Sequence, residues 1–344
     1  MINFKKSEGK YVSEETMTEI YEKIKTPYKY GAVLKFDEDL CDSPTVYRWK
    51  DKWYMSFIKI SKNTKTSGYN SHLATSEDLL HWKYVCQTTF RNENNAWDSK
   101  QIALYAAYVE NDLYGKYRLQ QVNGKYHFAY LGGCLDGYET DPLMIGQCKT
   151  ADICDANQYE RFPTPRLNPT DSDARKGETL TLYKSDMFID EAKTTGYTYV
   201  NAYNAKAENH KESIYLAVSK NGEDWERYGN RAIIFDDTPE QSQQINGDPQ
   251  ILKYKDIYIM LYFVLENGRT YDTFACSYDL EHWTKWKGKP LIESEEEWED
   301  LYAHKPCLVV ENEVVYHFYC AVNKRGERFI ALTTNCRALH NPQF

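Results

Sequence analysis

The residues best suited to chemistry in this sequence are carboxylates that come just before apolar, strand-like segments. Each segment alternates apolar and polar residues, which is typical of a β-strand. If such segments gather around one axis, the residues that open them converge on one face, and carboxylates held close together raise one another's pKa. Glycosidic bond hydrolysis needs such a pair, one carboxylic acid and one carboxylate. The five opening residues are Asp42, Asp98, Asp186, Asp248 and His304.

These side chains also have a simpler interpretation. An aspartate beside Pro or Ser at the start of a strand caps a turn by accepting a backbone N–H. Both interpretations stand for a single aspartate, whereas four carboxylates around one funnel favour catalysis, a bound cation or solvation. His304 has two interpretations as well, a ligand of a sugar hydroxyl or central ion, or a structural histidine.

The strand pattern repeats five times along the chain. Each copy has an apolar strand, a short polar turn, a strand centred on tyrosine, and a third strand that ends in Ser or Thr, an acid or amide, and often a tryptophan. A unit of this size cannot bury its own apolar face and must stack on its copies. The repeat predicts an all-β fold, a five-bladed β-propeller with a short N-terminal helix. We expect Trp82, Trp225 and Trp283 to pack between neighbouring units.

The segment before the first repeat has a different character. Ser13 is placed to cap a helix whose apolar residues recur at helical spacing until Pro27. We expect this helix to pack on the outside of the propeller or to form a dimer contact. The predicted organisation is an N-terminal helical extension over residues 1–30 and a propeller catalytic domain over residues 31–344.

Composition narrows the partners and the compartment. The net charge is −9 and no Lys/Arg cluster occurs, which argues against nucleic acid and anionic membranes as partners. Thirty tyrosines suggest aromatic platforms for an oligosaccharide, bound by a monomer or homodimer. Residues 1–9 lack the apolar core of a signal peptide, and the nine cysteines are scattered, so we expect a cytoplasmic protein with free thiols.

Three motifs carry a resemblance to a known group of enzymes. The first is a strand that opens with Asp and Pro. The second is the turn and return of residues 50–54 and 255–258, and the third is Ser-x-Asp-Leu-x-x-Trp at residues 76–82 and 277–283. Over residues 31 to 337 the chain resembles the five-bladed propeller glycoside hydrolases, most closely family 43. Families 32, 117 and 130 share that scaffold.

The resemblance implies roles for the carboxylates. Family 43 enzymes use a first-blade Asp as general base, a second Asp that tunes it, and a later Glu as general acid, usually with inversion. Asp42 resembles the base, and Asp98 or Asp186 the tuning residue. The family's Glu before Gly-Pro is absent, because residues 246–249 read Asn-Gly-Asp-Pro, so Asp248 is the substitute acid. Carboxylates kept in reserve are Glu139, Asp141, Glu178 and Glu266.

The remaining predictions concern binding and alternatives. Expected substrate-binding residues are His304, Lys305, Trp97 and Arg269. No cofactor is required, since phosphate-binding, zinc and nucleophile-elbow motifs are absent, but the acid ring could hold a structural calcium or sodium ion in the axial channel. The main prediction is an inverting glycosidase. A phosphorylase similar to family 130 and a non-catalytic sugar-binding propeller are the alternatives.

Overall fold

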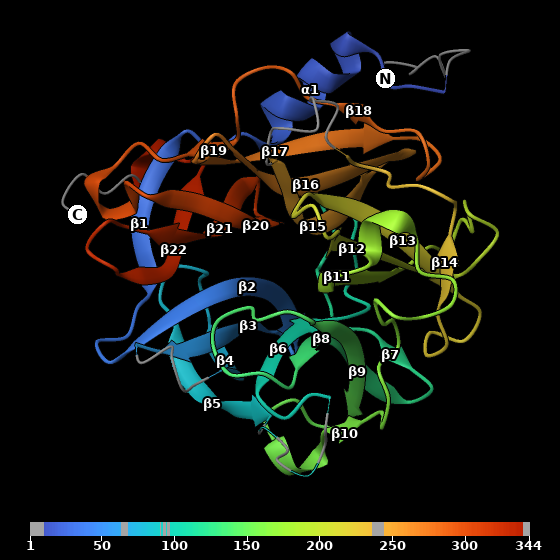
Figure 1. The fold of residues 1–344 in the computed structure, drawn as a ribbon. Helices are drawn as coiled ribbons and strands as arrows, with labels where there is room; N and C mark the ends of the chain where they lie inside the picture. Colours follow the sequence, from blue (N-terminus) through green and yellow to red (C-terminus); the bar gives the residue numbers. More distant parts are fainter. Residues whose placement is uncertain are drawn as a thin grey trace.

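The computed structural model describes residues 10–62, 68–89, 91, 94, 97–235 and 244–339. Its strands form four-stranded antiparallel units arranged around a central axis, with one α-helix outside them (Figure 1). The prediction of an all-β propeller with a short N-terminal helix is confirmed. Residues 1–9, where the sequence shows no signal-peptide core, lie outside the described residues.

The strands group into five antiparallel units, each running from the axis outward. A single parallel pair, Glu212 with Ile245, joins the third unit to the fourth. Two short strands, β7 (Gln121–Val122) and β19 (Ile292–Glu293), pair beside β8 and β17. The first two units are β2 (Asp39–Trp49), β3 (Lys52–Ser61), β4 (Tyr69–Ser76), β5 (Lys83–Thr89), and β6 (Gln101–Ala106), β8 (Lys125–Gly133), β9 (Met144–Thr150), β10 (Glu160–Arg161). The third and fourth are β11 (Thr181–Ile189), β12 (Tyr199–Lys206), β13 (Glu212–Ser219), β14 (Glu226–Tyr228), and β15 (Gln244–Tyr254), β16 (Ile257–Glu266), β17 (Arg269–Ser277), β18 (Thr284–Lys285).

The last unit is closed by the other end of the chain. It contains β20 (Tyr302–Glu311), β21 (Val314–Val322) and β22 (Arg328–Thr334), and its outer strand is β1 (Tyr28–Leu34), which pairs antiparallel with β22. Strand β1 spans residue 30, where the sequence placed the boundary of the helical extension. The propeller therefore includes residues on both sides of that boundary.

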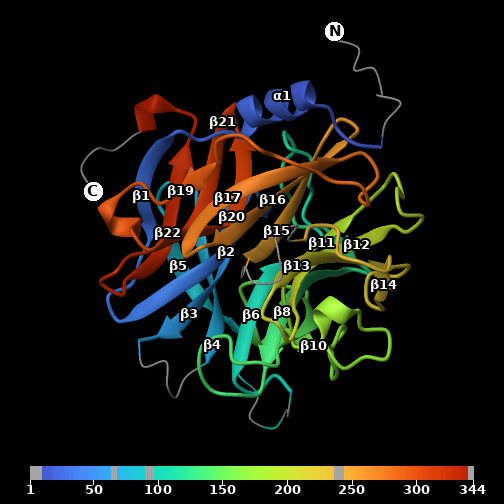
Figure 2. The ribbon, with the colours of Figure 1, turned by 45° about the horizontal axis from the view of Figure 1, so that its top comes forward.

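Helix α1 (Glu14–Ile24) lies on the outside of the fourth unit (Figure 2). The Ser13 side chain accepts a hydrogen bond from the backbone N–H of Thr16, as the sequence predicts. Met17, Ile20 and Ile24 are buried, and Tyr21 stacks on Trp286. This apolar face thus packs on the propeller. In the described part of the chain, no helix is long and apolar enough to cross a membrane.

The endings of the third strands work as predicted. Ser76 Oγ accepts the backbone N–H of Leu79, and an Asp78 oxygen accepts that of His81. Trp82 then packs edge-on against Phe318 of the last unit, at a ring-centroid distance of 5.7 Å. Such contacts bury apolar surface between neighbouring units. All nine cysteines are free thiols, five of them buried: Cys41, Cys148, Cys276, Cys307 and Cys320.

Candidate active site

Three inner strands begin with the same β-bulge. In β2, β15 and β20 the pairing skips one residue, after Asp42, Gly247 and His304 respectively. A bulge re-aims side chains out of the normal alternation of a strand. The residue that follows each skip precedes a proline and has a positive φ, 55° at Ser43, 53° at Asp248 and 67° at Lys305. The bulges therefore direct successive side chains toward one end of the axis.

That end contains a pocket bounded by the starts of inner strands and by the turns between second and third strands. It encloses about 660 Å³. The sequence predicted this face, because both kinds of segment open on it. Its lining residues are Tyr138, Glu139, Tyr183, Asn204, Glu212, Ile245, Asp248, Phe263, Leu265, Thr270, Tyr302, His304, Lys305 and Arg328.

Asp42 lies under this pocket and is fully buried. Its Oδ2 accepts hydrogen bonds from Tyr138 Oη at 2.9 Å, from Lys305 Nζ at 3.0 Å and from Arg328. Burial alone would raise the pKa of Asp42, but the charges of Lys305 and Arg328 hold it well below its usual range. Asp42 is therefore ionised and anchors two cations.

Lys305 links Asp42 to a second carboxylate. Its Nζ lies 3.2 Å from Glu139 Oε1, in the turn between β8 and β9. Burial would lower the pKa of Lys305, but Asp42 and Glu139 raise it well above its usual value. The Glu139 side chain is 30% exposed and lines the pocket. The lysine thus pairs with Glu139 where a substrate would enter.

Glu212 is the acid that the sequence interpretation missed. It is the first residue of β13, it lines the pocket, and it is 7% exposed. Burial, and then the negative charge of Glu139, raises the pKa of Glu212 to about 8. A carboxyl with this pKa keeps its proton at neutral pH. The signal was available, because third strands begin on the predicted face just as inner strands do.

Asp248 and His304 complete the polar lining. Burial raises the pKa of Asp248, against the charges of Lys305 and Lys184. Burial lowers the pKa of His304 to about 3, so its ring is neutral. His304 Nδ1 lies 3.2 Å from the Cys320 carbonyl oxygen and therefore donates to it, while its ring packs edge-on against Phe263.

The structure places the other predicted residues elsewhere. Asp98 is buried beside Tyr130 Oη (3.0 Å) and Arg161 (3.2 Å), and Trp97 stacks on Tyr130. Arg269 is largely exposed and pairs with a glutamate outside the pocket lining. Pocket and under-layer thus bring together four of the eight predicted residues, Asp42, Asp248, His304 and Lys305, but not Asp98, Asp186, Trp97 or Arg269.

The reserve carboxylates divide in the same way. Only Glu139 among them lines the pocket. Asp141 pairs with Lys206 at 2.9 Å, and Glu178 is buried against Arg175 and Arg227. Glu266, at the end of β16, is partly exposed and also lies outside the lining.

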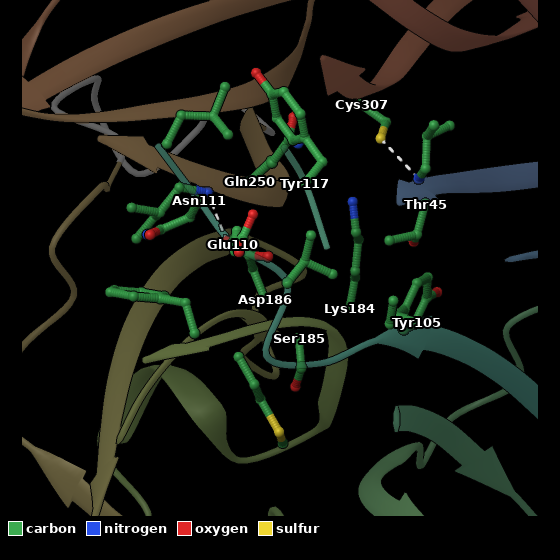
Figure 3. A pocket seen from close by; sticks show the side chains of 17 residues that line it. Thr45, Tyr105, Glu110, Asn111, Tyr117, Lys184, Ser185, Asp186, Gln250 and Cys307 are labelled. Atoms are coloured by element: carbon green, nitrogen blue, oxygen red, sulfur yellow. Dashed lines mark hydrogen bonds between the residues drawn. The ribbon is translucent and has the colours of Figure 1, made fainter. Parts of the chain in front are cut away.

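Asp186 lines a separate axial cavity (Figure 3). Leu182, not Asp186, opposes β12 at the position where Asp42 opposes β3, so Asp186 lies further down the axis. Its Oδ2 accepts the Ile251 N–H at 2.5 Å, and burial raises its pKa to about 6. Lys184 points into the same cavity (Figure 3). Its ammonium makes this cavity a poor fit for calcium or sodium, and among the described residues no group of three or more His, Cys, Asp or Glu is arranged to hold a metal.

Comparison with known families gives one match. The glycosyl hydrolases family 32 N-terminal domain matches residues 109–307, which is more than half of the chain. A search of curated protein sequences finds no match.

Solved structures agree with this match. A structure named "Glycoside hydrolase" is 35% identical, with a TM-score of 0.89 over 94% of this chain and 96% of its own. A solved complex of BT0996 and RGII is also 35% identical, with a TM-score of 0.90 over 96% and 97%. A thermostable family-43 glycoside hydrolase shares the fold at 15% identity, with a TM-score of 0.63 over 93% and 98%. These similarities confirm the predicted resemblance to the propeller glycoside hydrolases.

Proposed function

The chain belongs to the glycosyl hydrolases with the family 32 N-terminal domain and is a glycosidase, and we propose that Glu212 and Glu139 are its catalytic pair. Glu212 is the general acid that protonates the glycosidic oxygen. Glu139 is the carboxylate on the other side of the reacting carbon. This assignment replaces Asp42 as the base and Asp248 as the first candidate for the acid.

One observation carries the proposal, the different environments of two carboxyl groups in one pocket. Burial and the Glu139 charge raise the pKa of Glu212 to about 8, whereas Glu139 forms an ion pair with Lys305. Two titratable groups whose surroundings favour opposite protonation states are the usual basis of acid–base assignment. Asp42 is enclosed by three donors under the pocket, so we assign it to hold Lys305 and Arg328 in place.

In the proposed reaction Glu212 gives its proton to the leaving-group oxygen as the bond to the anomeric carbon breaks. Glu139 takes a proton from a water molecule that attacks the opposite face, which inverts the anomeric configuration. Glu212 then regains a proton from solvent. Asp248, with its raised pKa, is the alternative acid, and its second proposed role is to bind a sugar hydroxyl.

The substrate that we propose is an oligosaccharide of plant or host type. The similar BT0996 structure is a complex with RGII, which supports a plant-type glycan. Tyr138, Tyr183, Tyr302 and Phe263 give the pocket aromatic faces of the kind that pack on sugar rings. We also propose a reducing, cytoplasmic environment, because all nine cysteines are free thiols.

A phosphorylase activity is the second candidate, because Lys305, Arg328 and His304 converge in the pocket. Phosphate would need donors that are free to bind it. Lys305 and Arg328 already pair with Asp42, and His304 is neutral. Hydrolysis is therefore the better supported reaction.

The test is turnover of a panel of 4-nitrophenyl glycosides and pectic oligosaccharides, with and without inorganic phosphate. We expect phosphate-independent release of sugar that Glu212→Gln and Glu139→Gln each reduce by about 100-fold or more. Full activity in both variants would overturn the assignment, and a requirement for phosphate would favour the phosphorylase. NMR of the first-formed anomer tests inversion.

A further inference from the structure

We infer that Asn204 is a positioning residue that decides which oxygen of Glu212 carries the catalytic proton. The inference rests on the proposed role of Glu212 as the acid. It concerns Asn204 on β12 and three residues at the start of β15 in the next unit.

The Asn204 amide has a defined orientation. Its Oδ1 accepts the backbone N–H of Asp248 at 3.3 Å, and its Nδ2 donates to Glu212 Oε2 at 3.1 Å. A backbone N–H can only donate, so the oxygen of the amide must face Asp248 and the NH2 group must face Glu212. Asn204 is 1% exposed, so water does not compete for these bonds.

The start of β15 supports this arrangement from three sides. The Asn246 side chain donates to the backbone oxygen of Glu212 at 3.4 Å, and Asp248 supplies the N–H that orients Asn204. Gly247 leaves room between them, because a Cβ there would lie 2.5 Å from a Phe263 ring carbon and 3.2 Å from Asn204 Nδ2. The Asn-Gly-Asp stretch, where the sequence lacks the acid of family 43, thus holds the acid of the neighbouring strand.

The consequence is a directed proton. Oε2 accepts an N–H and is therefore the unprotonated oxygen of the neutral carboxyl group. Oε1 accepts no hydrogen bond from the described residues, and Glu212 lines the pocket, so the proton on Oε1 is available to a substrate. The same bond lowers the pKa of Glu212 against the effect of burial, because an N–H donor favours the ionised form.

The experiment compares Asn204→Leu, which removes both hydrogen bonds, with Asn204→Asp, which keeps the acceptor for Asp248 and loses the donor. Asn201→Leu is the matched control, a buried amide on the same strand that bonds Ser185 outside the pocket. Kinetics are measured on two glycosides of the same sugar, one with a 4-nitrophenol and one with a 2,4-dinitrophenol leaving group, because the better leaving group depends less on proton donation.

In Asn204→Leu we expect kcat/KM for the 4-nitrophenyl glycoside to fall about 10- to 100-fold, with a much smaller loss for the dinitrophenyl glycoside. The alkaline limb of the pH profile should move to higher pH, because the donor that lowered the pKa of Glu212 is gone. We expect Asn201→Leu to change neither. Equal losses on both substrates with an unmoved limb would show that Asn204 acts only on folding or substrate binding.

A readout without substrate separates this inference from the proposed function. The infrared band of a protonated carboxyl group that disappears in Glu212→Gln reports Glu212 directly. We expect this band to shift and to titrate at higher pH in Asn204→Leu. An unchanged band would overturn the inference even if the enzyme is a glycosidase, and a shifted band in a chain without glycosidase activity would uphold the contact but overturn the function.

Discussion

Lys305 Nζ lies 3.0 Å from Asp42 Oδ2, and both side chains are buried although 263 residues separate them. Asp42 is on the first inner strand and Lys305 on the last. The same two parts of the chain are joined a second time where β1 pairs with β22. An ion pair under the pocket and a strand at the rim thus close the ring of units together.

The first prediction concerns this ion pair. Lys305→Met leaves Asp42 with one cation and Glu139 without its partner, so we expect the free energy of unfolding at pH 7 to fall by about 3–5 kcal/mol. The folded-state pKa of Asp42 is depressed, so its contribution to stability exists above the unfolded-state value of 3.8 and is lost as pH falls further. Urea unfolding at pH 7 and pH 3 measures both effects.

Lys59→Met is the control for this variant. Lys59 pairs with Asp39 in the same unit at 2.6 Å, but both side chains are partly exposed, so we expect a loss below about 1 kcal/mol. Similar losses in the two variants would mean that burial does not strengthen the Lys305 interaction.

The second prediction is a pH limit on activity. Glu212 must keep its proton, so kcat/KM should fall as pH rises through about 8, the pKa of Glu212. In Glu212→Gln we expect sugar binding to persist while turnover is lost. Profiles of kcat/KM from pH 5 to 10 test this, and a flat profile to pH 10 would contradict Glu212 as the acid.

The third prediction concerns the stability cost of Glu212. Its folded-state pKa is raised above the ordinary value of 4.5, so stability is highest below pH 4.5 and declines as pH rises through 8. Glu212→Gln removes this dependence. We expect its melting temperature to exceed that of the wild type more at pH 9 than at pH 5. The opposite trend would mean that Glu212 is ionised in the folded protein.

Much of the fold follows from local sequence signals. Lys50 and Asp51 both take positive φ, 48° and 61°, in a tight hairpin turn whose twist matches the strands, and the serine and aspartate caps recur in each clear copy. Periodicity and turns are local properties. They are therefore readable without an alignment.

The site was harder to predict because register, and not sequence position, decides which side chain meets the pocket. Strand β6 pairs without a bulge, so nothing turns Asp98 toward the axis as β15 turns Asp248. In β11 the bulge falls before Asp186, which sends that side chain down the axis. A one-residue skip is invisible in the apolar pattern. Glu212 was missed because the search covered inner strands and not third strands.

The fourth prediction separates Asp98 from the reaction. Asp98 bonds Tyr130 and Arg161 away from the pocket lining, so Asp98→Asn should lower stability by about 1–3 kcal/mol and leave kcat/KM within about threefold of the wild type. Differential scanning fluorimetry and kinetics on the same preparation test both statements. A loss of turnover as large as in Glu212→Gln would restore Asp98 as a catalytic candidate.

The axial cavity supplies the last prediction. Burial raises the pKa of Asp186 to about 6, and the charge of Lys184 acts in the opposite direction, so removing the lysine should raise that pKa further. A raised folded-state pKa gives stability that is present below the unfolded-state value of 3.8 and lost as pH rises through 6. Lys184→Met should therefore be less stable than the wild type, with the deficit larger at pH 8 than at pH 5. Adding Asp186→Asn should remove this dependence. Because Lys184 already supplies a positive charge in the cavity, EDTA and added calcium should leave the melting temperature of the wild type unchanged, whereas a calcium-dependent increase would place a cation on the axis.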